Sequence, residues 1–127
     1  MAGGLTYDTG ALIAAERDVR RIWALHRRSL ERGIVPTVPA GVLAQGWRGG
    51  PQHQLSRLLA GCRVEPLDEP RARSAGAACG AAGSSDVVDA AVIVGAAARG
   101  DIVVTSDPGD LLRLRDALRV SVRIETI

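Results

Sequence analysis

The sequence contains no lysine and no phenylalanine, and it has only one tyrosine, two tryptophans and two cysteines. Without lysine, no amine side chain is available for catalysis or for a lysine-dependent phosphate site. Without phenylalanine, leucine, valine, isoleucine and alanine must supply the hydrophobic core. Cys62 and Cys79 lack metal-ligand spacing, so we expect two small buried side chains rather than a metal site.

Long apolar runs are also missing. The longest, from Ala90 to Ala98, is far too short to span a bilayer. The N-terminus has no basic segment followed by an apolar one, so no signal peptide is predicted. Nearly half of the 127 residues are apolar, which indicates one globular domain over residues 1–127. Because neither a signal peptide nor a membrane span is predicted, we expect a cytoplasmic protein.

Short apolar runs rich in β-branched residues alternate with longer segments of helical periodicity. Strands are predicted at 5–8, 34–38, 63–67, 102–105 and 120–127, and helices at 11–17, 18–32, 39–48, 51–61, 69–82, 86–99 and 108–118. Pro36 favours either an edge position or an irregular start for its strand. This order predicts an α/β fold, with a parallel sheet covered by helices on both faces.

Aspartates recur where predicted strands end and helices begin. Asp8 and Asp107 each follow a strand, and each is also a candidate helix N-cap. Asp89 lies within the apolar helix at 86–99, where an unpaired carboxylate is costly. Ser84 or Ser85 is expected to cap that helix.

Carboxyl ends of parallel strands meet at one edge of a sheet, and ligands gather there. Asp8, Asp89 and Asp107 are therefore candidate catalytic and metal-binding residues, and a set of oxygen ligands without histidine or cysteine suits Mg²⁺ or Mn²⁺. Such a site can activate water for phosphodiester hydrolysis. Supporting roles are assigned to neighbouring polar residues, which position a carboxylate or a water, bind through water or cap helices: Thr105, Ser106, Asp86 and Asp110.

Four segments resemble the PIN-domain ribonucleases, and within them the VapC-type toxins of bacterial toxin–antitoxin pairs. They are YDTGAL at 7–12, VPAGVLAQGWR at 38–48, DVVDAAV at 86–92 and VVTSDPGDL at 103–111. The resemblance implies a three-layer α/β/α sandwich around a mainly parallel sheet of about five strands. It also implies a Mg²⁺-dependent endoribonuclease, frequent homodimerisation and inhibition by a cognate antitoxin. On this pattern Asp8 takes the first acid position, Asp89 the third and Asp107 the fourth.

The second acid position departs from the family pattern, because Gln45 stands where the family usually has glutamate. A glutamine oxygen can coordinate an ion or hold a water, but it adds no negative charge. Glu16, on the first helix, is a candidate to compensate, although about 12 Å of helical rise from Asp8 favours a surface or supporting role.

All sixteen basic residues are arginine, and the net charge is +2. Six arginines fall between Arg17 and Arg32, which indicates either a solvated helix face or a surface for nucleic acid. Trp23 and Trp47 are expected in the core, with a partner surface as the alternative. The candidate RNA-binding residues are Arg20, Arg21, Arg48 and Arg99.

Other functions remain as alternatives. With Gln45 in place of an acid, the fold could serve as a catalytically weak or inactive module that binds RNA or a protein partner. A phospho-acceptor domain is disfavoured because those families use a lysine at the site, and this chain has none. A dinucleotide site is disfavoured because the segment LTYDTGAL has no glycine-rich fingerprint.

Overall fold

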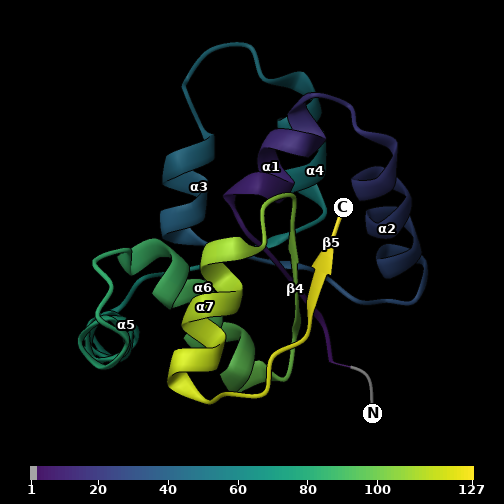
Figure 1. The fold of residues 1–127 in the computed structure, drawn as a ribbon. Helices are drawn as coiled ribbons and strands as arrows, with labels where there is room; N and C mark the ends of the chain where they lie inside the picture. The colour runs from purple at the N-terminus through teal and green to yellow at the C-terminus, as the bar shows by residue number, and fades with distance from the viewer. Residues whose placement is uncertain (1–2) are drawn as a thin grey trace.

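The computed structural model describes residues 3–127 (Figure 1). The strands in this range are β1 (Leu5–Tyr7), β2 (Thr37–Pro39), β3 (Arg63–Glu65), β4 (Ile102–Thr105) and β5 (Ile124–Thr126). The helices are α1 (Thr9–Glu16), α2 (Arg20–Glu31), α3 (Ala40–Gly46), α4 (His53–Ala60), α5 (Glu69–Ala82), α6 (Val87–Arg99) and α7 (Gly109–Leu118).

All strand pairs are parallel, and the strand order is β3-β2-β1-β4-β5. The chain steps from β1 to β3 in one direction and from β3 to β5 in the other, so right-handed connections place the two groups of helices on opposite faces. Figure 1 shows this arrangement, with α1, α2 and α4 on one side and α5, α6 and α7 on the other. The structure confirms the α/β fold expected from the sequence.

The core is built from small and branched side chains. Tyr7, Leu12, Ile22 and Ile93 are among its largest fully buried members. Helix α6 packs against the three inner strands, which explains why its sequence is apolar almost all round. Cys79 is buried and Cys62 is partly buried, and both are free thiols.

The structure resolves the ambiguity at Pro36. Strand β2 starts after this residue and lies inside the sheet, between β1 and β3. Pro36 still takes part in the pairing with β3, because its carbonyl accepts a hydrogen bond from the Arg63 amide at 2.8 Å. Proline therefore marks an irregular strand start here, not an edge strand.

Two predicted helix caps and one predicted core residue are wrong. Asp86, not Ser84 or Ser85, caps α6 by accepting from the Asp89 amide at 3.0 Å. The cap residue of α7 is Pro108 rather than Asp107, and no side chain caps this helix. Trp47 is 41% exposed at the end of α3 instead of lying in the core.

Within residues 3–127, no single helix is long and apolar enough to cross a membrane.

Candidate active site

Asp8 lies at the carboxyl end of β1 and is also the N-cap of α1. Its carboxylate accepts hydrogen bonds from the Ala11 amide at 3.0 Å and from the Thr105 hydroxyl at 2.6 Å. The side chain is buried, with 7% of the residue exposed. Burial raises the pKa of the Asp8 carboxyl, and the Asp107 charge adds to the rise, while these hydrogen bonds oppose it. Capping a helix and belonging to an acidic site are therefore compatible roles for this residue.

The chain after β4 is held against the start of α1. The buried Thr105 hydroxyl donates to Asp8 and accepts from the Asp107 amide at 3.0 Å, so one hydroxyl connects both carboxylate-bearing segments. Ser106 is exposed and lies on Gly10, where a Cβ atom would approach the serine oxygen to 2.5 Å. Glycine at this position therefore allows the two strand-end loops to lie side by side.

Asp89 enters the same region from the first turn of α6. Burial raises the pKa of its carboxyl to about 7, and the charges of Asp86, Asp8 and Asp110 add to the rise. Asp8 therefore lies within electrostatic reach of both Asp107, after β4, and Asp89, on α6. We call Asp8, Asp86, Asp89, Asp107 and Asp110 the acidic cluster.

The acidic cluster has little compensating positive charge within residues 3–127. Of its members, only Asp110 forms an ion pair within residues 3–127, with Arg113. In that range no three histidine, cysteine or acidic side chains stand close enough together to hold a metal ion. The charge distribution therefore suits a cation, although the carboxylates do not form a ready-made three-residue ligand set.

Gln45 reaches the edge of this site from the end of α3. Its side-chain oxygen accepts a hydrogen bond from the hydroxyl of Thr9, the residue after Asp8, at 2.6 Å. The side chain is exposed. Gln45 is thus beside the acidic cluster, in the position where the family resemblance leads us to expect an acid.

Comparisons with known proteins show the fold. No protein-family model matches the chain, and no curated protein matches it in sequence. Among solved structures, it is similar to PAE2754 from Pyrobaculum aerophilum, with 18% sequence identity and a TM-score of 0.61 over 92% of this chain and 87% of that one. It is also similar to a chain of FitAB bound to an IR36 DNA fragment, with 17% identity and a TM-score of 0.61 over 96% and 94% of the two chains. These similarities support the PIN-like architecture.

Two sequence candidates serve the fold rather than the acidic cluster. Glu16 accepts a hydrogen bond from the Leu55 amide at 2.7 Å, and so caps the first turn of α4. Arg99 forms ion pairs with Glu65 and Asp101 and also donates to Thr6 at 2.9 Å. Because its guanidinium is occupied in this way, we leave Arg99 out of the RNA-binding residues.

The other candidate arginines are exposed. Arg21 donates to the Thr126 carbonyl at 3.4 Å, and Thr126 aligns with Thr105 in the sheet, so Arg21 lies at the carboxyl edge. Arg48 donates to the carbonyl oxygens of Gln45 and Trp47 at the end of α3. Arg20 is the first residue of α2.

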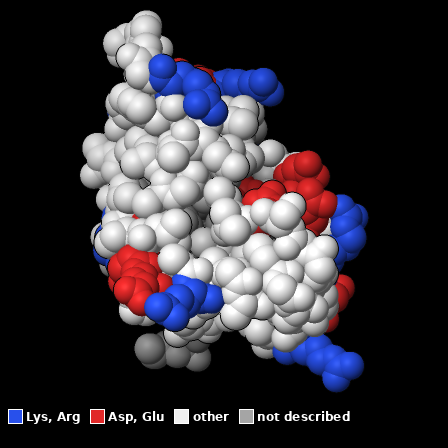
Figure 2. All heavy atoms as spheres, turned by 90° about the vertical axis from the view of Figure 1, so that its left-hand side faces the viewer, with Lys and Arg blue, Asp and Glu red and all other residues white. Residues whose placement is uncertain are grey.

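Sequence reasoning missed Arg113. A hollow of about 360 Å³ next to the acidic cluster is lined by Asp86, Asp89, Asp110 and Arg113, together with the loop between α5 and α6. Figure 2 shows acidic side chains gathered on this face with a basic group beside them. The signal in the sequence was the spacing of Asp110 and Arg113, which puts both on one face of α7.

Proposed function

We propose that this protein is a metal-dependent endoribonuclease that hydrolyses RNA phosphodiester bonds. The observation that supports the proposal is the acidic cluster itself: the Asp107 charge adds to the raised pKa of Asp8, the Asp8 charge adds to the raised pKa of Asp89, and within residues 3–127 no arginine pairs with any of the three. Bringing uncompensated carboxylates together costs free energy, and a divalent cation offsets that cost.

Asp8, Asp89 and Asp107 would hold Mg²⁺ or Mn²⁺ in this proposal. The ion would supply counter-charge for the phosphate and lower the pKa of a bound water. Asp8 is fixed by hydrogen bonds from Thr105 and Ala11, so its carboxylate is held in one orientation. Arg113 is placed to contact a phosphate that enters the hollow beside Asp89.

We further propose that the protein is the toxin of a toxin–antitoxin pair and forms a homodimer. The support is the resemblance of the four sequence segments, together with the structural similarity to a chain of FitAB. A co-purified or neighbouring-gene partner that blocks RNA cleavage would be the antitoxin.

Cleavage of a mixed tRNA and rRNA pool tests the nuclease. The purified protein is expected to cleave with Mg²⁺ or Mn²⁺ and not with EDTA, and Asp8→Asn is expected to lose about a hundredfold or more of the rate. Asparagine also caps helices, so α1 should still form in this variant. Asp116→Asn, at an exposed position on α7, is the matched control and should cleave like the parent. Equal cleavage by Asp8→Asn would refute the assignment.

Gln45→Glu is expected to tighten Mn²⁺ binding by about tenfold, because it adds a carboxylate at the edge of the acidic cluster. Glutamate can still accept the Thr9 hydrogen bond, so the local structure should persist. Calorimetry measures the affinity, and Ser56→Glu on α4 controls for the added net charge. An unchanged or weaker affinity would mean that Gln45 lies outside the ion's reach.

The second candidate is a PIN-fold module that binds RNA or a protein without cleaving. Two observations favour it: Gln45 replaces the expected acid, and residues 3–127 contain no ready-made three-ligand group. A folded protein that binds RNA but does not cleave it with either Mg²⁺ or Mn²⁺ would support this candidate.

A further inference from the structure

A hollow of about 420 Å³ is lined by residues of α2 and α4 and of the adjoining turns. These two helices lie on the face of the sheet opposite to α6 (Figure 1). The hollow belongs to neither the acidic cluster nor the core. Its size suits a nucleotide-sized ligand. Aromatic, basic, acidic and apolar side chains from both helices and the adjoining turns line it: Asp18, Trp23, His26, Arg27, Leu30, Arg57 and Gly61.

Trp23 and Arg57 both line this hollow and form a cation–π pair. The Arg57 guanidinium carbon lies 4.5 Å from the centre of the indole ring. The indole is fixed by a hydrogen bond from its nitrogen to the Ala15 carbonyl at 3.1 Å, and its ring meets the His26 ring edge-on. Nucleic-acid bases stack on aromatic rings and on guanidinium planes, so a guanidinium paired with an indole offers a surface of the kind that a base uses.

His26 is aimed into the hollow while almost wholly buried, with 4% of the residue exposed. Its Nδ1 atom is 2.8 Å from the Tyr7 hydroxyl, and within residues 3–127 its Nε2 atom has no hydrogen-bond partner. The buried Tyr7 hydroxyl has no other acceptor in that range, so it donates to Nδ1 and leaves the proton on Nε2. Nε2 is therefore a donor that faces the hollow, where a water or a ligand can accept from it.

Gly61 keeps this donor accessible. A Cβ atom at this position would lie 3.0 Å from His26 Nε2. The backbone of Gly61 has φ of −96°, which other residues adopt without strain, so the backbone conformation does not require glycine. The missing side chain leaves space in front of the imidazole.

We propose that this hollow binds a nucleoside monophosphate unit, free or within single-stranded RNA, with the base on Arg57 and the phosphate between Arg27 and His26. Two arginines, Arg27 and Arg57, and one carboxylate, Asp18, line the hollow, so its net positive charge favours an anion. Asp18 is available to accept from a ribose hydroxyl or a base amine. The proposal does not depend on the nuclease, because none of these residues belongs to the acidic cluster.

Fluorescence of Trp23 tests the proposal. The full chain contains two tryptophans, so Trp47→Phe leaves Trp23 as the single reporter. Adenosine 5′-monophosphate and an oligoadenylate RNA are titrated in EDTA, which prevents metal-dependent cleavage, with adenosine and inorganic phosphate as comparisons. We expect saturable quenching by the nucleotide, weakened about tenfold by Arg57→Lys, which keeps the charge but loses the stacking plane.

Gly61→Ala, which places a methyl group against His26 Nε2, should weaken binding similarly. If Gly61→Ala fails to fold, Arg27→Ala, at an exposed position, gives the same test. Arg73→Ala on α5, on the other face, is the control and should bind like the parent. Tighter binding of RNA than of the mononucleotide would identify an RNA contact, and equal binding a free-nucleotide site.

Absence of saturable quenching in the folded protein would overturn the proposal. So would equal affinity in the Arg57→Lys and Arg27→Ala variants, or binding of inorganic phosphate as tight as that of the nucleotide. Because the titrations contain EDTA, each of these results leaves the proposed nuclease untouched.

Discussion

Asp89→Asn is expected to stabilise the metal-free protein while it removes metal-dependent RNA cleavage. Asp89 is half-buried among like charges, and its carboxyl pKa is raised to about 7 from an ordinary value of 3.8. Neutral asparagine relieves this repulsion, and the Asp86 cap on the Asp89 amide does not involve the substituted side chain. Allowing for solvent screening, the gain at neutral pH should be about 1–2 kcal/mol, or roughly 3–6 °C in melting temperature.

The gain should depend on pH in a defined direction. A carboxyl with a raised folded-state pKa binds more protons in the folded state than in the unfolded state between pH 3.8 and about 7. The stability of the parent therefore falls as the pH rises through this window, and the penalty is complete above it. The parent and Asp89→Asn should melt together near pH 4 and diverge up to about pH 7, above which the difference should stay constant.

Thermal melts in EDTA at several pH values measure this difference, and Asp116→Asn controls for removal of an exposed carboxylate. A destabilised Asp89→Asn protein, or a difference independent of pH, would show that the acidic cluster carries no such strain. Cleavage by Asp89→Asn at the rate of the parent would separately remove Asp89 from the proposed site.

The sequence was sufficient to predict the fold and the approach of the acidic segments. Apolar runs such as Ile102–Thr105 specify strands, and parallel strands bring their carboxyl ends to one edge. Asp8 and Asp107 therefore had to lie near each other once both strands were assigned. The similarity to PAE2754, over 92% of this chain, confirms this architecture at the level of the fold.

Details that depend on side-chain reach were not predictable from spacing. Glu16 caps α4 from a distant part of the sequence, and nothing near Leu55 signals this contact. Adjacent Ser84, Ser85 and Asp86 were all reasonable caps for α6, and the choice depended on which backbone torsion placed an oxygen at the Asp89 amide. Trp47 is exposed because α3 ends one residue before it.

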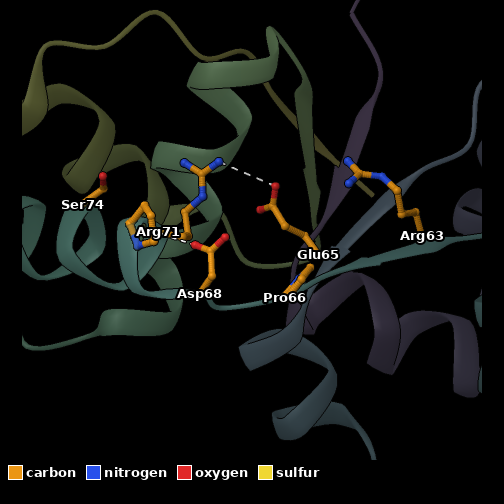
Figure 3. A pocket seen from close by; sticks show the side chains of 7 residues that line it. Arg63, Glu65, Pro66, Asp68, Arg71 and Ser74 are labelled. Atoms are coloured by element: carbon orange, nitrogen blue, oxygen red, sulfur yellow. Dashed lines mark hydrogen bonds and ion pairs between the residues drawn. The ribbon is translucent and has the colours of Figure 1, made fainter.

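Arg99 was assigned from its charge alone, and the structure places it in a polar network. Its guanidinium reaches Asp101 at 2.9 Å and also pairs with Glu65, which lies 3.6 Å from Arg71 (Figure 3). Gly95, one turn earlier on α6, makes room for the pair between Arg99 and Glu65, because a Cβ atom there would approach both side chains closely. These contacts tie α6 to β1, β3 and the start of β4.

Arg99→Ala is consequently expected to cost about 3–5 kcal/mol of unfolding free energy, because it leaves Asp101 and Glu65 without their main partner. Asp101 has 6% of its side chain exposed and would keep only the hydrogen bonds from the Gly4 amide and the Thr6 hydroxyl, neither of which offsets its charge. Arg73→Ala removes an exposed pair with Glu69 and should cost less than about 1 kcal/mol. Urea unfolding of both variants gives the comparison.

The combination Arg99→Met, Asp101→Asn and Glu65→Gln separates charge from packing. Removing all three charges avoids the buried unpaired carboxylates, so this protein should recover much of the stability that Arg99→Ala loses. Recovery together with unchanged Mn²⁺ affinity would establish that the network holds α6 on the sheet independently of the acidic cluster. A triple variant as unstable as Arg99→Ala would mean that the packing of the long Arg99 side chain, rather than its charge, stabilises this part of the fold.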